Sequence, residues 1–104
     1  MADNNRLDDH AIEHWFVYIV ECADGTFYTG ITNHLERRID QHNAGRGARY
    51  TRGRRPVALR YHENQRDRSN ASTREREIKA LPRREKQKLR DRKFLSFSAS
   101  LARG

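Results

Sequence analysis

Two short runs of aromatic and β-branched residues, at positions 15–22 and 26–31, are separated by the dipeptide Asp24-Gly25. Such runs are typical of β-strands, and an Asp-Gly pair between two of them is a strong indication of a β-hairpin. The first run is apolar or aromatic at both even and odd positions, so neither face of its strand can be left in water. We therefore expect a hairpin whose first strand lies in the middle of a sheet.

Each strand of the predicted hairpin carries a tyrosine. Successive strand residues point to opposite faces, so Tyr18 shares a face with Val20. Tyr28 must point to that same face if the two phenols are to belong to one site. In the helix predicted after the hairpin, Arg38 and His42 are four residues apart and therefore lie on one side of it. Four polar groups from three elements can then converge on one surface.

The rest of the chain predicts helices around one further strand. Thr32 or Asn33 is expected to cap the first helix, residues 67–70 supply caps for the second, and Pro82 begins the third. The predicted fold class is α+β, with a three-stranded antiparallel sheet flanked by helices in the order ββαβαα. The expected elements are strands at 15–22, 26–31 and 57–62, and helices at about 33–43, 71–81 and 82–92.

A single domain accounts for the 104 residues, since a chain of this length has room for one modest core. Residues 1–13 are polar and mixed in charge, and we expect them to form a loose N-terminal arm. Residues 94–104 are expected to be a C-terminal tail, which leaves 14–93 for the domain. Within it, residues 44–56 hold three glycines and five arginines, a composition typical of a mobile basic loop.

The charge balance points to a polyanionic partner. Lysine and arginine number 22 against 14 acidic residues, a net charge of +8 that attracts nucleic acid and raises its encounter rate. A membrane surface is disfavoured, because the chain has no apolar stretch near 18 residues. The first residues do not resemble a secretory signal, so we expect a cytoplasmic protein. The highly charged surface favours a monomer, with no obligate protein partner indicated.

Cys22 is the only cysteine. An intramolecular disulfide and a zinc site with ordinary cysteine spacing are therefore excluded. A nucleophilic role would require a neighbouring base, whereas a lone cysteine at a strand end is more often a small buried apolar residue. We expect Cys22 to belong to the core.

Several short segments of the chain, in the order in which they occur, resemble the GIY-YIG nuclease family and in particular its small single-domain bacterial members. The chain departs from the family name at Val17, where glycine is named, and at Thr29, where isoleucine is; strand geometry allows both positions to vary. The resemblance covers about residues 15–90. It is carried by Val17-Tyr18-Ile19, Tyr28-Thr29-Gly30, Ile31-Thr32-Asn33, residues 35–38, Gln41-His42 and residues 75–81.

The resemblance implies a divalent-metal-dependent DNA endonuclease with an Mg²⁺ or Mn²⁺ ion. It places Tyr18, Tyr28, Arg38, His42 and Glu75 on the family's catalytic positions. Tyr18 is then the general base, with a pKa that nearby positive charge is expected to lower, and Tyr28 and His42 orient or assist it. Arg38 stabilises charge on the phosphate, and Glu75 holds the metal. Many relatives carry tyrosine in place of His42, which leaves open a role for this histidine as a proton relay.

Simpler interpretations stand beside these roles. Strand tyrosines are commonly packing residues, and Arg37 and Glu77 are adjacent rivals of Arg38 and Glu75. Glu75 also has the spacing of an ordinary surface ion pair with Lys79. We expect phosphate contacts from basic residues of the loop and of the second helix: Arg46, Arg49, Arg52, Arg54 and Lys79.

Two other functions are compatible with the composition. One is a basic nucleic-acid-binding module without turnover, which would bind in a salt-sensitive way but not cleave. The other is a scaffold whose basic surface meets an acidic protein. Larger relatives gain specificity from an attached DNA-binding domain that this sequence lacks, so an endonuclease of this kind is expected to have little sequence preference.

Overall fold

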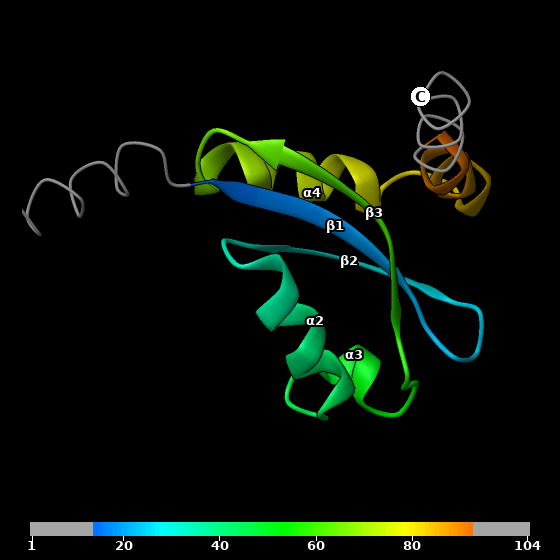
Figure 1. The fold of residues 1–104 in the computed structure, drawn as a ribbon. Coiled ribbons are helices and arrows are strands. Elements are labelled where there is room, and N and C mark those ends of the chain that lie inside the picture. The colour runs from blue at the N-terminus through cyan, green and yellow to red at the C-terminus, as the bar shows by residue number, and fades with distance from the viewer. Residues whose placement is uncertain (1–13, 93–104) are drawn as a thin grey trace, which may run out of the picture.

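The computed structural model describes residues 14–92, and the arm and tail expected at 1–13 and 94–104 lie outside this range. The α+β fold is confirmed, with helices on both faces of a three-stranded sheet (Figure 1). The elements, in order, are β1 (Trp15–Glu21), β2 (Phe27–Thr32), α2 (Leu35–Asn43), α3 (Arg49–Arg52), β3 (Ala58–Gln65), α4 (Arg68–Lys79) and a further helix whose described part is residues 83–92.

The sheet has the strand order β2-β1-β3, with both pairs antiparallel. The expected central position of the first strand is confirmed, and all four of its residues from 17 to 20 are buried. Tyr18 is paired with Gly30 on β2, and Val20 is paired with Tyr28. Because directly paired residues point to the same face, Tyr18 and Tyr28 share a face as predicted.

A separate apolar cluster covers each face of the sheet. On one face, Val17 and Ile19 pack with Ala71 and Ile78 of α4 and with Leu89. On the other face, the cluster of Tyr18, Val20, Cys22 and Val57 is covered by Leu35 and Ile39 of α2 together with Tyr28 and Leu59. The sheet is therefore the middle layer, with α4 on one side and α2 and α3 on the other (Figure 1). Cys22 is buried, as expected.

Three details differ from the predictions. The cap of α2 is His34, whose Nδ1 accepts from the backbone N–H of Arg37, because the Thr32 hydroxyl instead accepts from the His34 N–H. The third strand runs three residues further than expected, and α4 begins three residues earlier, capped by Asp67.

The loop expected at 44–56 contains the short helix α3, so the order of elements is ββααβα before the last helix. Two hydrogen bonds join the two flanks of this segment to each other, since the Asn43 side-chain amide donates to the Val57 carbonyl and accepts from the Val57 N–H. Within residues 14–92, no helix is long and apolar enough to cross a membrane.

Candidate functional site at the edge of the sheet

The site is built where the Tyr18 side chain crosses the edge strand β2. A Cβ atom placed on Gly30 would lie 2.6 Å from the Tyr18 hydroxyl oxygen, so only glycine leaves room for the phenol at this position. The ring of Tyr28 lies beside that of Tyr18, with the centroids 6.5 Å apart. The absence of a side chain at residue 30 therefore brings two phenols together at the edge of the sheet.

Behind Tyr18 runs a buried chain of hydrogen bonds. The Tyr18 hydroxyl lies 2.8 Å from His42 Nε2, His42 Nδ1 lies 2.8 Å from the Thr51 hydroxyl, and that hydroxyl donates to the Ala48 carbonyl at 3.0 Å. Thr51 has one hydroxyl proton and uses it on Ala48, so it must accept from His42 Nδ1–H. His42 Nε2 then carries no proton, and Tyr18 donates to it.

Burial fixes the charge states of this chain. It raises the pKa of Tyr18 to about 12, although the guanidinium of Arg38, as hydrogen-bond partner and as positive charge, acts in the opposite direction. It also lowers the pKa of His42 to about 4, helped by the positive charge of Arg38. The lowered pKa expected for Tyr18 is therefore wrong for the protein alone, because desolvation outweighs the positive field. His42 likewise is neutral near pH 7.

Tyr18 has no exposed surface, so its phenol lies beneath the surface on which the four polar groups were expected to converge. Tyr28 is partly exposed, and its hydroxyl has no hydrogen-bond partner among residues 14–92. The two tyrosines thus have different environments, one held inside by His42 and one free to meet a ligand. Both nevertheless contact His42, whose ring centroid lies 5.9 Å from that of Tyr18 and 5.4 Å from that of Tyr28.

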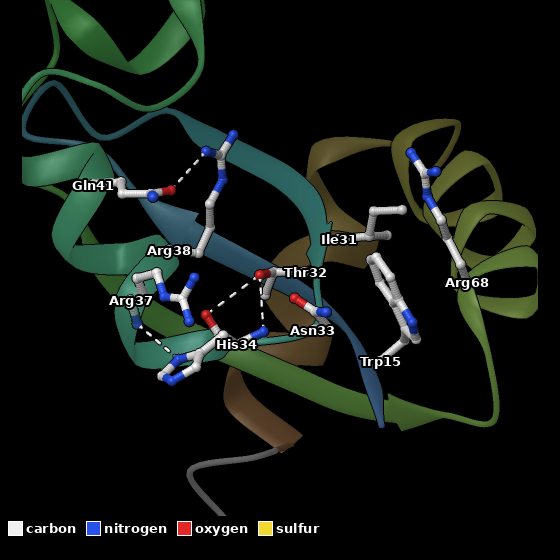
Figure 2. Close-up of a pocket in the computed structure, with 9 residues that line it drawn as sticks. All are labelled: Trp15, Ile31, Thr32, Asn33, His34, Arg37, Arg38, Gln41 and Arg68. Atoms are coloured by element: carbon white, nitrogen blue, oxygen red, sulfur yellow. Dashed lines mark hydrogen bonds between the residues drawn. The ribbon is translucent and has the colours of Figure 1, made fainter. Parts of the chain in front are cut away.

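Arg38 is the arginine of α2 that faces the phenols. Its side chain is half-buried, influences the pKa of both Tyr18 and His42, and donates to the Gln41 side-chain oxygen at 3.1 Å (Figure 2). Arg37 is exposed and takes no part in the hydrogen bond between Arg38 and Gln41. The structure thus places Arg38 closer to the phenols than its neighbour.

Glu75 reaches the same edge from α4, on the other side of the sheet. It is close enough to Tyr18 to raise its pKa, and its side chain is 20% exposed. One turn later, Lys79 pairs with Glu75 at 3.1 Å and lies 5.9 Å from the centroid of the Tyr28 ring. Glu77 instead pairs with Arg74. The structure therefore brings Tyr18, Tyr28, Arg38, His42 and Glu75 to one edge of the sheet.

A metal at this place would have one protein carboxylate. Within the described part of the chain, no group of three or more His, Cys, Asp or Glu side chains is placed to hold an ion. Glu75 alone fits Mg²⁺ or Mn²⁺, which bind through one or two carboxylates when water and substrate phosphate supply the other oxygens. The carboxylate already accommodates a cation, the ammonium of Lys79.

The ring of Tyr28 belongs to an aromatic stack, which the sequence did not indicate. The exposed ring of Tyr50 in α3 stacks on Tyr28 at 5.9 Å and 23°, and the Arg54 guanidinium lies 4.0 Å over Tyr50. Arg54 is itself fixed by Asp24 at 2.9 Å and by the Tyr50 carbonyl at 2.8 Å. Arg54 therefore has an internal role, whereas Arg46, Arg49, Arg52 and Lys79 are exposed.

The family model of the GIY-YIG catalytic domain matches residues 14–89, and the chain belongs to this family. A domain of this nuclease family implies a nucleic-acid substrate. Among known proteins the chain is similar to a group of small proteins named UPF0213. It is 58% identical over 86 residues to the UPF0213 protein DP2720 of Desulfotalea psychrophila, covering 82% of this chain and 78% of that protein.

Two further comparisons agree with this placement. A UPF0213 protein of Halobacterium salinarum is 53% identical over 73 residues, which cover 70% of this chain and 95% of the relative. Among solved structures, the solution NMR structure of EF2693 from E. faecalis matches with a TM-score of 0.54 and 37% identity, covering 79% of this chain and 88% of that one. The likeness thus extends over nearly the whole of both relatives.

Proposed function

We propose that the protein is a divalent-metal-dependent endonuclease that hydrolyses phosphodiester bonds in DNA with little sequence preference. The observation that carries the proposal is the meeting of two phenols, a guanidinium, an imidazole and a carboxylate at the edge of β2. Phosphodiester cleavage needs a proton acceptor for the attacking water and positive charge beside the phosphoryl oxygens. The residues at this edge provide a candidate for each requirement.

Arg38 would bind the scissile phosphate. Its planar guanidinium suits two phosphate oxygens, and it is already held at the site by Gln41. Because Arg38 is also a hydrogen-bond partner of Tyr18, a bound phosphate would compete for the same guanidinium. Substrate binding would thereby free the Tyr18 oxygen, which is closed off in the unliganded structure.

The proton path would run from water to Tyr18 and on to His42. Burial raises the pKa of Tyr18 and lowers the pKa of His42, so the neutral forms of both side chains are favoured in the unliganded site. The Tyr18 phenol is therefore protonated before the reaction. The Tyr18 oxygen would accept the proton of the attacking water while its own proton moves to His42 Nε2.

In this step the water O–H bond breaks as its oxygen bonds to phosphorus, and the bond from phosphorus to the leaving oxygen breaks. The leaving oxygen takes a proton from solvent. To complete the cycle, Tyr18 releases one proton to solvent and takes back its own proton from His42 Nε2. Tyr28, whose hydroxyl is free, would orient the water or a phosphoryl oxygen. Glu75 would hold the divalent ion, which when bound supplies Lewis-acid stabilisation of the phosphoryl charge.

One observation favours a second candidate, a nucleic-acid-binding module without turnover. Tyr18 is fully buried and its pKa is raised, so the phenol assigned as the general base is not ionised in the unliganded site. Such a module would bind nucleic acid through Arg46, Arg49, Arg52 and Lys79 but leave the strand intact. Metal-dependent cleavage separates the two candidates.

The test is cleavage of labelled DNA and RNA with Mg²⁺ or Mn²⁺. We expect Tyr18→Phe, Arg38→Ala and Glu75→Ala each to lower the rate by roughly 10²-fold or more, as for a lost acid–base or charge-stabilising group. Glu77→Ala is the matched control for Glu75 and should cleave like the parent. Undiminished cleavage by all three variants would defeat the assignment, and absence of cleavage by the parent would favour the binding module.

A further inference from the structure

A basic pocket adjoins the edge site on its Arg38 side. It has a volume of about 300 Å³ and lies between the start of β1, the end of β2 and the N-terminal ends of α2 and α4 (Figure 2). Arg37 and Arg38 line it from α2, Arg68 lines it from α4, and Trp15 lies beside Ile31 with the Arg68 guanidinium over its ring. Its size is at the lower end of the range for small-ligand pockets.

The pocket is cationic without internal compensation. None of its nine lining residues is acidic, and within residues 14–92 none of its three guanidiniums forms an ion pair. Arg37 and Arg68 are exposed and Arg38 is half-buried. Three positive charges around one small hollow, with no acidic partner among the described residues, strongly favour an anionic ligand.

The neutral polar groups of the pocket are mostly engaged with one another. The Thr32 hydroxyl donates to the His34 carbonyl and accepts from its N–H, His34 Nδ1 accepts from the Arg37 N–H, and the Gln41 oxygen accepts from Arg38. What remains for a ligand is chiefly guanidinium N–H groups and the indole ring. Such a set holds phosphate and stacks on a base, but it does not read base edges.

Trp15 supplies the stacking surface. The ring is only partly buried, with one part packed on the cluster under α4, and the Arg68 guanidinium lies 5.7 Å from its centroid. Every base offers a π-face to an aromatic ring, but in a duplex that face is covered by the neighbouring base pairs. A base can therefore reach Trp15 only when it is unpaired.

We propose that this pocket binds one unpaired nucleotide next to the scissile phosphate, with its base against Trp15 and its phosphate held by Arg37 and Arg68. This inference rests on the proposed function and names its substrate class, a single-stranded nucleic acid or segment. The pocket shares Arg38 with the edge site. In addition, Arg68 and Glu75 are seven residues apart, so they lie on the same side of α4 at about 10 Å along its axis. One strand thus passes from the pocket to the site.

Trp15 is the only tryptophan of the chain, so its fluorescence reports on the pocket directly. The full chain is titrated, without divalent metal, with a dT oligonucleotide, with a duplex of the same length and with pyrophosphate. We expect saturable quenching by the single strand and at least about fivefold weaker quenching by the duplex. Pyrophosphate should bind with little change in emission, because it has no base.

Two variants and a matched control locate the effect. Arg37→Gln and Arg68→Gln should each weaken single-strand binding by about fivefold or more, whereas Arg76→Gln, an exposed arginine on the same helix as Arg68, should stay within about twofold of the parent. Circular dichroism checks that all three are folded. Equal quenching by the duplex, full quenching by pyrophosphate, or equal losses in the Arg68 and Arg76 variants would each overturn the proposal.

The outcome is separable from that of the cleavage test. If the parent cleaves a duplex while single strands leave Trp15 emission unchanged, the endonuclease stands and the nucleotide pocket falls. If single strands quench the emission but no substrate is cleaved with either metal, the pocket stands and the endonuclease falls. Glu75→Ala should lose cleavage and keep the quenching.

Discussion

In the series of hydrogen bonds from Tyr18 through His42 to Thr51, whether each side chain donates or accepts depends on where the next side chain carries its proton. The Thr51 hydroxyl donates its hydrogen bond to the Ala48 carbonyl. His42 must therefore donate from Nδ1 and accept from Tyr18 at Nε2. A proton added to Nε2 would remove that acceptor and place a charge in a fully buried ring. His42 therefore couples the stability of the protein to pH as well as aligning Tyr18.

This coupling predicts acid destabilisation that depends on His42. The folded state lowers the pKa of His42 from 6.5 to about 4, so the unfolded chain binds more protons between these values. Stability is then fully present above about pH 6.5 and is lost as pH falls towards 4, by up to about 3 kcal/mol. We expect urea unfolding of the parent to show this loss beyond that of His42→Gln. Parallel pH profiles for the two proteins would contradict it.

The sequence reveals which residues form the site better than it reveals the environment of each residue. The order of Tyr18, Tyr28, Arg38, His42 and Glu75 was visible in the sequence because each lies in a short recognisable segment. The protonation state of Tyr18 was not, because its pKa is set by burial under side chains that are distant in the sequence. The expected lowered pKa counted the nearby positive charge but not the burial of the phenol, which has the larger effect on the pKa.

Among the elements, the hairpin shows most directly how strand sequence makes the site. Tyr18 and Tyr28 are brought together because β2 carries glycine at the position paired with Tyr18. A Cβ at Gly30 would lie 2.6 Å and 2.8 Å from the hydroxyl oxygen and Cζ of Tyr18. The phenol cannot easily move away, since His42 holds its hydroxyl. Gly30 is therefore a structural requirement of the site.

Gly30→Ala is expected to destabilise the protein by about 1–3 kcal/mol, the usual cost of forcing an extra carbon into a packed region. It should also weaken cleavage, because the Tyr18 ring must shift from His42. The control is Gly53→Ala, where an added Cβ meets nothing within 4 Å and φ is −92°. That change should be neutral or slightly stabilising. Urea midpoints and cleavage rates measure both, and equal behaviour of the two variants would refute the requirement.

The periodic elements were predictable, and the irregular ones were not. The aromatic and β-branched runs at 15–22 and 26–31 and the helical spacing after residue 33 identify the hairpin and α2, because each element buries a continuous apolar face. Helix α3 was hidden inside a segment of glycines and arginines. Its formation depends on the burial of Thr51 against His42 and on the Tyr50–Tyr28 stack, contacts that no local pattern reveals.

For the molecule as a whole, the three-layer arrangement makes the edge of β2 a place that side chains from both α2 and α4 reach. Arg38 and His42 come from the layer on one side of the sheet, and Glu75 and Lys79 come from the other. Arg74 fixes α4 against β3 by pairing with Glu63 at 2.8 Å, which strongly raises the pKa of the guanidinium. The relative position of the two layers thus sets the geometry of the site.

The net charge of +8 predicts salt-dependent binding whose slope counts the phosphate contacts. Arg46, Arg49 and Arg52 are exposed, so each substitution by glutamine should reduce the slope of log K against log salt by about 0.7 for single-stranded DNA. Arg54 is the matched control from the same segment, because Asp24 and Tyr50 already hold its guanidinium. Arg54→Gln should leave the slope unchanged. Fluorescence anisotropy of a labelled oligonucleotide across a salt series measures the slopes. If Arg54→Gln reduces the slope as much as the substitutions of the exposed arginines do, the internal pairs of Arg54 do not persist in the complex. A slope near zero for the parent protein would contradict the predicted phosphate contacts altogether.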